Sequence, residues 1–199
     1  MAWKWDPERG SRMPLADSNS EIHISLKPLE SFLLVLETGE SEGGSAYPQV
    51  KQAVEELIIQ SDWTAEFYPV DGKSFTRTFK DLIDLKESDD PLLQNFAGDI
   101  HYKARFDALE SNFSSLDLGE VNDGVTKVIL NGMSLGKKWY GKHVYEVGSQ
   151  LRLGPNEIEI VYTSLLSNYC RSIDKVEAQR WIGDRELISN GITGPVVFK

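Results

Sequence analysis

This chain of 199 residues has one cysteine, three histidines and no long run of apolar residues, and each scarcity excludes a class of protein. With Cys170 alone, it can form neither an internal disulfide bond nor a cysteine-rich zinc site. Three histidines, His23, His101 and His143, do not suggest a histidine metal cluster. No apolar stretch approaches the roughly 20 residues with which a helix spans a bilayer. Disulfide-rich, zinc-dependent and helical membrane proteins are therefore set aside.

Positive charge is also scarce, with 21 Lys and Arg against 31 Asp and Glu and a formal net charge of -10. Such an acidic chain repels a phosphate backbone, and no Lys/Arg stripe stands out in the sequence to reverse this locally. We therefore expect neither nucleic acid nor an anionic membrane as a partner, which leaves neutral sugars or another protein. The first residues, "MAWKWDPERG", lack the features of a secretory signal peptide. Either the protein is cytoplasmic or the chain is a piece of a longer one.

The N-terminal part predicts two strands followed by a linker. Ile22, Ile24 and Leu26 alternate with polar residues, which is typical of a half-buried strand. Phe32–Leu36 is continuously apolar, which predicts a strand covered on both faces. The following Gly-, Ser- and Glu-rich stretch predicts a linker at residues 41–49. It separates a β appendage, residues 1–40, from a main domain, residues 50–199.

The main domain has many short strand patterns separated by turns. The segment "QVKQAVEELIIQ" is ambiguous between helix and strand, but "DWTAEFYP", "SFTRTF" and "VTKVIL" favour strands. Residues 81–94 are polar and predict a loop. Two strands alternate clearly. One buries Ile100, Tyr102, Ala104 and Phe106, and the other buries Ile158, Ile160 and Tyr162.

Turn chemistry and the lack of helical periodicity complete the prediction of the fold. Asn131-Gly132 supplies the two residues with positive φ of a tight hairpin, and Gly136 indicates a second backbone bend. Many short strands with regular turns predict an all-β protein, a two-sheet β-sandwich.

No catalytic residues can be singled out. A glycosidase needs two carboxyl groups flanking the scissile bond, one of them with a raised pKa. Nothing in the sequence marks such a pair among the 31 acidic residues. The chain also lacks a G-x-S-x-G elbow and a phosphate-binding P-loop.

Aromatic residues outside the strand patterns are the candidates for binding. Trp139, Tyr140, Tyr169 and Trp181 all lie in predicted loops. Aromatic rings in loops can stack on the apolar face of a sugar, while polar neighbours hold its hydroxyl groups. Alternatively, these rings close the ends of the sandwich, and the sequence leaves both interpretations open.

The order of several motifs resembles a known family. "LDLGEVNDGVTKVILNGMSLGKKW" is similar to the sugar-binding-like, galactose-binding-like jelly-roll domain of family 2 glycoside hydrolases, and "GPNEIEIVYT" matches its "G-x-N-x-I-x-I" strand. "WDPERGSRMPL", "ISLKPLESFLLVL", "SDWTAEFYP…FAGDIHYKARF" and "SNGITGPVVF" resemble the C-terminal part of α-L-rhamnosidase-like enzymes of the family-106 type.

The resemblance implies a non-catalytic accessory module of a larger glycoside hydrolase. Its partner is then the catalytic domain of the same polypeptide, and plant or bacterial polysaccharide is a further partner. The parent enzyme is expected in the periplasm or outside the cell. No cofactor is expected, although sandwiches of this sort often hold a structural calcium ion. An autonomous carbohydrate-binding module and, more remotely, a small complete enzyme remain alternatives. The residues expected to contact carbohydrate are Trp139, Tyr140, His143, Tyr169, Arg171 and Trp181.

Overall fold

The computed structural model describes residues 2–6, 11–15, 22, 24, 26, 31–37, 56–182 and 185–199. The chain divides into two compact units, Met1–Gln52 and Ala53–Lys199. The predicted linker, residues 41–49, lies outside the described residues, as do Val50 and Val54 of the ambiguous segment.

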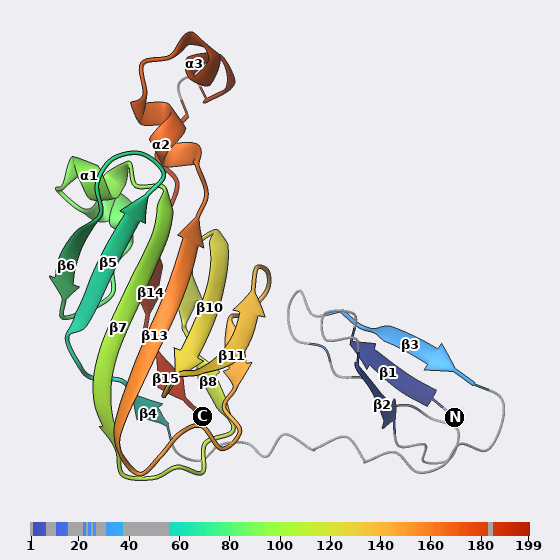
Figure 1. Ribbon diagram of the computed structural model, residues 1–199. Helices are drawn as coiled ribbons and strands as arrows, with labels where there is room; N and C mark the ends of the chain where they lie inside the picture. The colour runs from blue at the N-terminus through green and yellow to red at the C-terminus, as the bar shows by residue number, and fades with distance from the viewer. Residues whose placement is uncertain are drawn as a thin grey trace. The chain divides into compact units, whose positions relative to one another are not determined.

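The first unit contains a three-stranded antiparallel sheet with the order β2-β1-β3 (Figure 1). Its strands are β1 (Ala2–Asp6), β2 (Ser11–Leu15) and β3 (Leu33–Leu36). Trp3 is buried, its indole N–H donates to Glu37 Oε2 at 2.9 Å, and the Arg12 guanidinium lies 4.7 Å from its ring centroid. These contacts tie the three strands together.

Two expectations for this unit need correction. Ile22, Ile24 and Leu26 lie outside any strand, and Ile24 and Leu26 are exposed. The strand predicted at Phe32–Leu36 is confirmed as β3, but it is not covered on both faces. Within the described residues, Leu33 is 55% exposed and Leu36 is 70% exposed. Leucines on this strand therefore present apolar surface.

The second unit is built on a six-stranded antiparallel sheet with the order β11-β10-β13-β7-β5-β6 (Figure 1). The bounds are Trp63–Pro69 (β5), Phe75–Phe79 (β6), Gly98–Ala108 (β7), Gly124–Leu130 (β10), Met133–Lys138 (β11) and Gly154–Ser164 (β13). The long strands β7 and β13 pair at the centre of this sheet, whereas β11 and β6 form its two edges.

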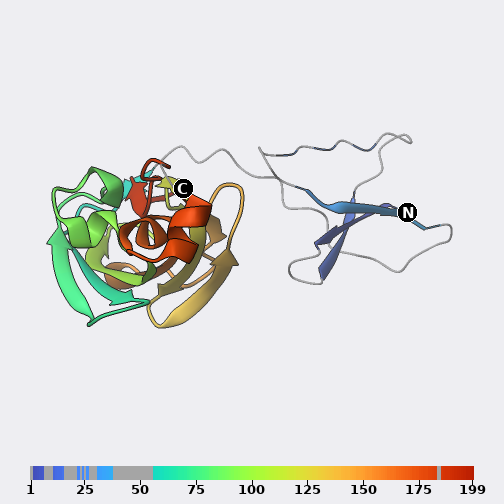
Figure 2. The ribbon, with the colours of Figure 1, turned by 90° about the horizontal axis from the view of Figure 1, so that it is seen from above.

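Shorter strands form the second layer. A four-stranded sheet has the order β12-β8-β15-β4, and β14 pairs with β9. Their bounds are Leu57–Ile58 (β4), Ser115–Asp117 (β8), Glu120–Val121 (β9), Val144–Glu146 (β12), Ile192–Gly194 (β14) and Val197–Phe198 (β15). Seen from above, these strands lie on one side of the curved six-stranded sheet (Figure 2). The prediction of an all-β sandwich is confirmed.

The core lies between these two layers. Ile100, Tyr102, Ala104 and Phe106 of β7 are at most 9% exposed, as the alternation predicted. The Phe106 ring lies 5.4 Å from that of Phe198 in β15, so the two layers are in direct contact. The inward residues of β13, Ile158, Ile160 and Tyr162, belong to the same cluster. Burial of this apolar surface is the main force that holds the sandwich together.

Short helices interrupt the strands. The segment 81–94, expected as a polar loop, contains the 3-10 helix η1 (Leu85–Glu87) and the helix α1 (Pro91–Gln94). The side chains of Asp84 and Asp90 cap them, and each helix buries one leucine in the core. After β13 the chain leaves the sandwich through α2 (Ser167–Ser172) and α3 (Val176–Ile182), at the top of Figure 1.

The hairpin between β10 and β11 turns at Asn131 and Gly132, whose φ values of 51° and 82° confirm the predicted turn. The register then shifts by one residue. Ile129 faces Ser134, but Val128 faces Gly136, which leaves Leu135 as the extra residue of a β-bulge. The predicted bend at Gly136 is part of this bulge, with φ at 112°.

Candidate functional site: the loop after strand β11

Two neighbouring aromatic side chains project from the loop between β11 and β12. Trp139 is 56% exposed and Tyr140 is 41% exposed. Their ring centroids lie 5.7 Å apart with an interplanar angle of 63°. Both rings therefore offer surface to a ligand, as one of the two interpretations of the sequence requires. A large exposed aromatic pair of this kind can receive the apolar face of a sugar or of a nucleobase.

His143 lies beneath this loop and is only 6% exposed. It was expected to contact carbohydrate, and its ring is almost fully covered by protein. Its Nδ1 lies within hydrogen-bond distance of Thr126 Oγ1, and the same hydroxyl contacts Tyr145 Oη. Tyr145 Oη also donates to the carbonyl oxygen of Thr126 at 3.0 Å. His143 thus anchors the end of the loop to strand β10.

Burial determines the charge state of this polar cluster. Desolvation lowers the pKa of His143, and the nearby ammonium of Lys138 lowers it further. The imidazole is therefore held neutral at physiological pH. Burial likewise raises the pKa of Tyr145 to about 12, so its hydroxyl remains protonated and can donate. The cluster is suited to positioning the loop rather than to proton transfer with solvent.

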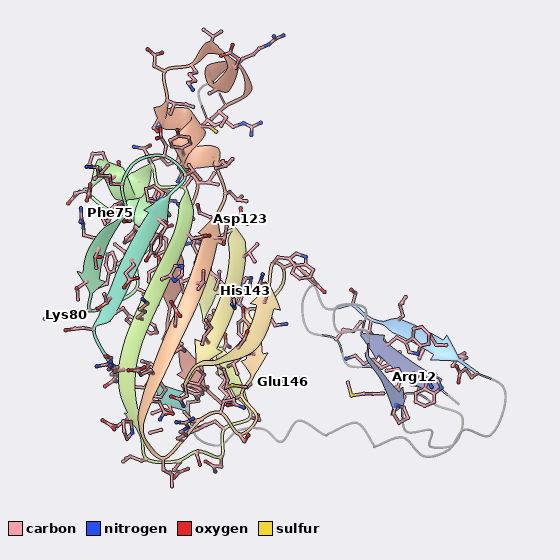
Figure 3. The ribbon with its side chains drawn as sticks, viewed as in Figure 1. Arg12, Phe75, Lys80, Asp123, His143 and Glu146 are labelled. Atoms are coloured by element: carbon pink, nitrogen blue, oxygen red, sulfur yellow. The ribbon has the colours of Figure 1, made fainter. Side chains whose placement is uncertain are left out.

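Backbone contacts fix both ends of the loop. The carbonyl oxygen of His143 accepts from the N–H of Leu118 at 3.1 Å, and Gly141 has a φ of 69° that suits glycine. Strand β12 begins at Val144 and pairs with β8, so that Tyr145 faces Leu116. Figure 3 shows His143 on the side of the sheet that carries β10 and β11, away from Lys80 and Phe75.

The other expected binding residues lie elsewhere. Tyr169 and Arg171 belong to α2, where the Tyr169 hydroxyl donates to Asp71 Oδ2 at 3.2 Å and Arg171 Nε donates to the carbonyl oxygen of Arg185 at 2.8 Å. Both bonds fasten the helical excursion to neighbouring loops. The side chain of Trp181 lies outside the described residues. Among the expected residues, Trp139 and Tyr140 thus contact each other, and His143 ends the same loop.

The hairpin motif itself serves the structure. Asn131 Nδ2 donates to Asn156 Oδ1 at 2.7 Å, and Asn156 also bonds the backbone of Arg152 and Gly154. A surface hollow of about 520 Å³ lies beside them, but these bonds already occupy both amides. Asn156 is 2% exposed, and the motif "N-G…G-P-N" therefore locks two turns together. Sequence reading missed this link, as it missed Thr126 and Tyr145.

The carboxyl groups with shifted pKa values do not resemble a glycosidase pair. Hydrogen bonds from Lys103 and Tyr68 lower the pKa of Glu66, and a hydrogen bond from Arg77 lowers that of Asp90. A general acid requires a shift in the opposite direction. Among the residues that the structure describes, no group of three or more His, Cys, Asp or Glu is arranged to hold a metal ion. Nor does any described helix have the length and apolar character needed to cross a bilayer.

Comparison with known proteins places these features in context. No family model matches the sequence. A putative β-glucuronidase of Formosa agariphila is 26% identical over 175 residues, which is 77% of this chain and 14% of that protein. The structure of a rhamnosidase from Novosphingobium sp. PP1Y aligns with this chain at a TM-score of 0.69 and 22% identity. The alignment covers 100% of this chain and 20% of the rhamnosidase chain. A β-D-glucuronidase of Dictyoglomus thermophilum covers 76% of this chain with a TM-score of 0.47.

The first two matches share a feature. Both proteins are glycoside hydrolases by name, and this chain spans no more than 20% of the length of either. The likeness to the rhamnosidase shows the fold. The chain therefore has the fold of one part of a larger glycoside hydrolase.

Proposed function

We propose that this chain is a non-catalytic accessory module of a larger, α-L-rhamnosidase-like glycoside hydrolase, with a galactose-binding-like β-sandwich that supports the catalytic domain. One observation carries the proposal: all of the chain matches the fold of a rhamnosidase, yet it accounts for 20% of that enzyme. The parent enzyme then acts on polysaccharide in the periplasm or outside the cell.

The carboxyl groups support a non-catalytic role. Retaining and inverting glycosidases keep one carboxylic acid protonated so that it can donate to the leaving group. Lys103 and Arg77 instead favour the deprotonated carboxylates of Glu66 and Asp90, because they lower the pKa of each group. Both serve ion pairs, Glu66 with Lys103 at 2.8 Å and Asp90 with Arg77 at 3.0 Å.

The first unit supports a docking role. Trp5, Leu33 and Leu36 are 38%, 55% and 70% exposed. They belong to a small three-stranded sheet that leaves these apolar side chains in contact with solvent. Apolar surface on a small sheet favours contact with further protein. The proposed occupant is the remainder of the parent hydrolase, because the matched rhamnosidase has 80% of its length outside the match.

The loop after β11 gives the module a second role, which is contact with glycan. Trp139 and Tyr140 offer exposed aromatic rings in a loop whose end the His143 cluster anchors to β10. This pair also favours the alternative of an autonomous carbohydrate-binding module.

A domain-deletion experiment tests the supporting role. The parent gene is expressed with and without residues 1–199, and hydrolysis of an aryl rhamnoside and thermal unfolding of the remaining enzyme are measured. Deletion is expected to lower the melting temperature of the catalytic domain while this chain alone shows no turnover. Turnover by the isolated chain, or an open reading frame confined to this chain, contradicts the proposal.

A matched pair of variants tests the docking surface. Leu33→Asp and Leu36→Asp place a charge on the apolar strand, whereas Leu109→Asp alters a residue that is 92% exposed in the second unit. The β3 variants are expected to destabilise the parent enzyme, and the Leu109 variant is not. Equal effects contradict docking through β3.

A further inference from the structure

The edge of the six-stranded sheet beside Trp139 carries a concentration of lysines. The segment "KKWYGKH", residues 137–143, contains three lysines around two aromatic residues, and Lys127 lies on the adjacent strand β10. These lysines concentrate positive charge at this edge, although no basic stripe was expected from the sequence. In a chain with a net charge of -10, such a local excess of positive charge requires an explanation.

The bulge in β11 brings two of these lysines face to face. Because Leu135 is an extra residue, Lys127 pairs with Lys137, whereas an uninterrupted hairpin would pair it with Gly136. Like charges directly opposite each other on neighbouring strands destabilise a sheet. The fold therefore maintains an unfavourable pair at this position.

No carboxylate compensates this pair. In the part of the chain that the structure describes, no ion pair involves Lys127, Lys137, Lys138 or Lys142. Glu159, on the strand next to β10, faces Ile129 and already contacts His101 at 2.8 Å and Lys103 at 3.9 Å. Lys127 and Lys137 share the outer face of the hairpin, Lys138 pairs with the buried Thr126 on the other face, and Lys142 follows in the loop.

We infer that the edge formed by Lys127, Lys137, Lys138, Trp139 and Lys142, called the lysine edge, binds an acidic glycan through its carboxylate or sulfate groups. This inference names the ligand class for the glycan contact in the proposed function and rests on it. The aromatic rings take the apolar faces of the sugars, and the lysines take their anionic groups. A bound anionic group that lies between Lys127 and Lys137 relieves the repulsion between their ammonium groups.

Charge density favours a glycan over nucleic acid. Duplex DNA carries one negative charge per roughly 1.7 Å, which an acidic protein repels outside any local patch. A glycan with one carboxylate or sulfate group per sugar unit places its charges further apart than duplex DNA does. The lysines on the outer face of this edge can match such a ligand, whereas the remaining surface with its excess of Asp and Glu opposes a densely charged polyphosphate.

The test compares polymers and two matched double variants. Binding of the chain to polygalacturonate, dextran sulfate, neutral dextran, single-stranded DNA and phosphatidylserine vesicles is measured by calorimetry and tryptophan fluorescence at low salt. The variant Lys127→Gln/Lys137→Gln removes the facing pair. The control Lys73→Gln/Lys80→Gln removes the same charge from exposed residues beside β6, at the opposite edge of the sheet.

The expected result is binding to polygalacturonate or dextran sulfate that weakens at least about tenfold in the lysine-edge variant and with added salt. The control variant should bind as the wild type does, and the preferred polymer identifies carboxylate or sulfate as the recognised group. The inference is overturned if neither acidic polymer binds, if neutral dextran binds equally well, or if both double variants weaken binding alike. Tighter binding to DNA or to vesicles overturns it as well.

Melting temperatures of the isolated chain and its variants show whether a loss of binding reflects a loss of folding, and they do not require the parent enzyme. Without ligand, Lys127→Gln/Lys137→Gln should be at least as stable as the wild type, because it removes a repulsive pair. A loss of stability there contradicts the argument from repulsion. Failure of the polymers to bind leaves the supporting role intact, because domain deletion tests that role separately.

Discussion

Basic side chains at the centre and at the edge of the six-stranded sheet differ in whether they form ion pairs. At its centre, Lys103 on β7 meets Glu66 at 2.8 Å, and Arg105 meets Glu157 at 2.7 Å. At its β11 edge, Lys127 faces Lys137 with no carboxylate in reach among the described residues. Both regions are antiparallel ladders, and they differ in the side chains that the register places opposite each other. The cations at the centre are paired within the protein, whereas among the described residues those at the edge form no ion pair.

The largest expected effect concerns the opposite face of the same edge. Leu130 is fully buried and pairs with Ile158 across β10 and β13. Leu130→Ala should lower the free energy of unfolding by about 2–5 kcal/mol, because it leaves a cavity in the core. Chemical denaturation measures this change, and Lys127→Gln on the same strand serves as the control. A similar loss in both variants would show that the edge is a structural element rather than a free surface.

A smaller loss is expected where the two regions are joined. Asn156 on β13 links to Asn131 at the turn between β10 and β11. Asn156→Ala should cost about 1–3 kcal/mol because it leaves buried hydrogen-bonding groups without a partner. The same denaturation measurement applies, and amide exchange at residues 129–134 should accelerate. If exchange accelerates only at β7, the link does not hold the edge.

The buried histidine gives the edge a pH dependence. Burial lowers the pKa of folded His143 below its ordinary value, so the unfolded chain binds a proton more readily. Its contribution to stability is complete above the unfolded pKa, near 6.5, and is lost as the pH falls toward the folded value. His143→Gln should therefore flatten the decline in stability between about pH 7.5 and pH 5.5. A steeper decline in the variant would contradict this assignment.

The smallest effects test the comparison itself. Lys103→Gln removes the partner of Glu66 and should lower stability by a few tenths to about 1 kcal/mol, because the pair is partly exposed. Lys127→Gln should change stability by a similar amount in the opposite direction. Calorimetric melting at low and high salt measures both, and salt should reduce each effect. If both substitutions changed the stability in the same direction, the distinction between the centre and the edge would not hold.

Some of this could be predicted from the sequence and some could not. The alternation around Tyr102 and Ile160 identified the buried faces correctly, because these strands do pair within the sheet. The same pattern at Ile22–Leu26 failed, because alternation states which face a strand would bury and not whether a partner strand exists. The turn at Asn131-Gly132 was predictable because few other residues adopt positive φ.

The site was less predictable because it depends on distant contacts. The aromatic pair was identified, but burial of His143 requires Thr126, 17 residues away, and Tyr145, which contacts that same threonine. The facing lysines depend on the register of the hairpin. Counting back from the turn pairs Lys127 with Gly136, and only the extra Leu135 brings Lys137 into that position.

The bulge at Leu135 thus determines which side chains face each other at this edge. If β11 paired without the bulge, Leu135 would enter the ladder and every position from Thr126 to Val128 would exchange its partner, while the turn and the inward leucine at 130 stayed in place. The pairing of two like charges at the surface therefore depends on one bulged residue, whereas the buried face of the same strand does not.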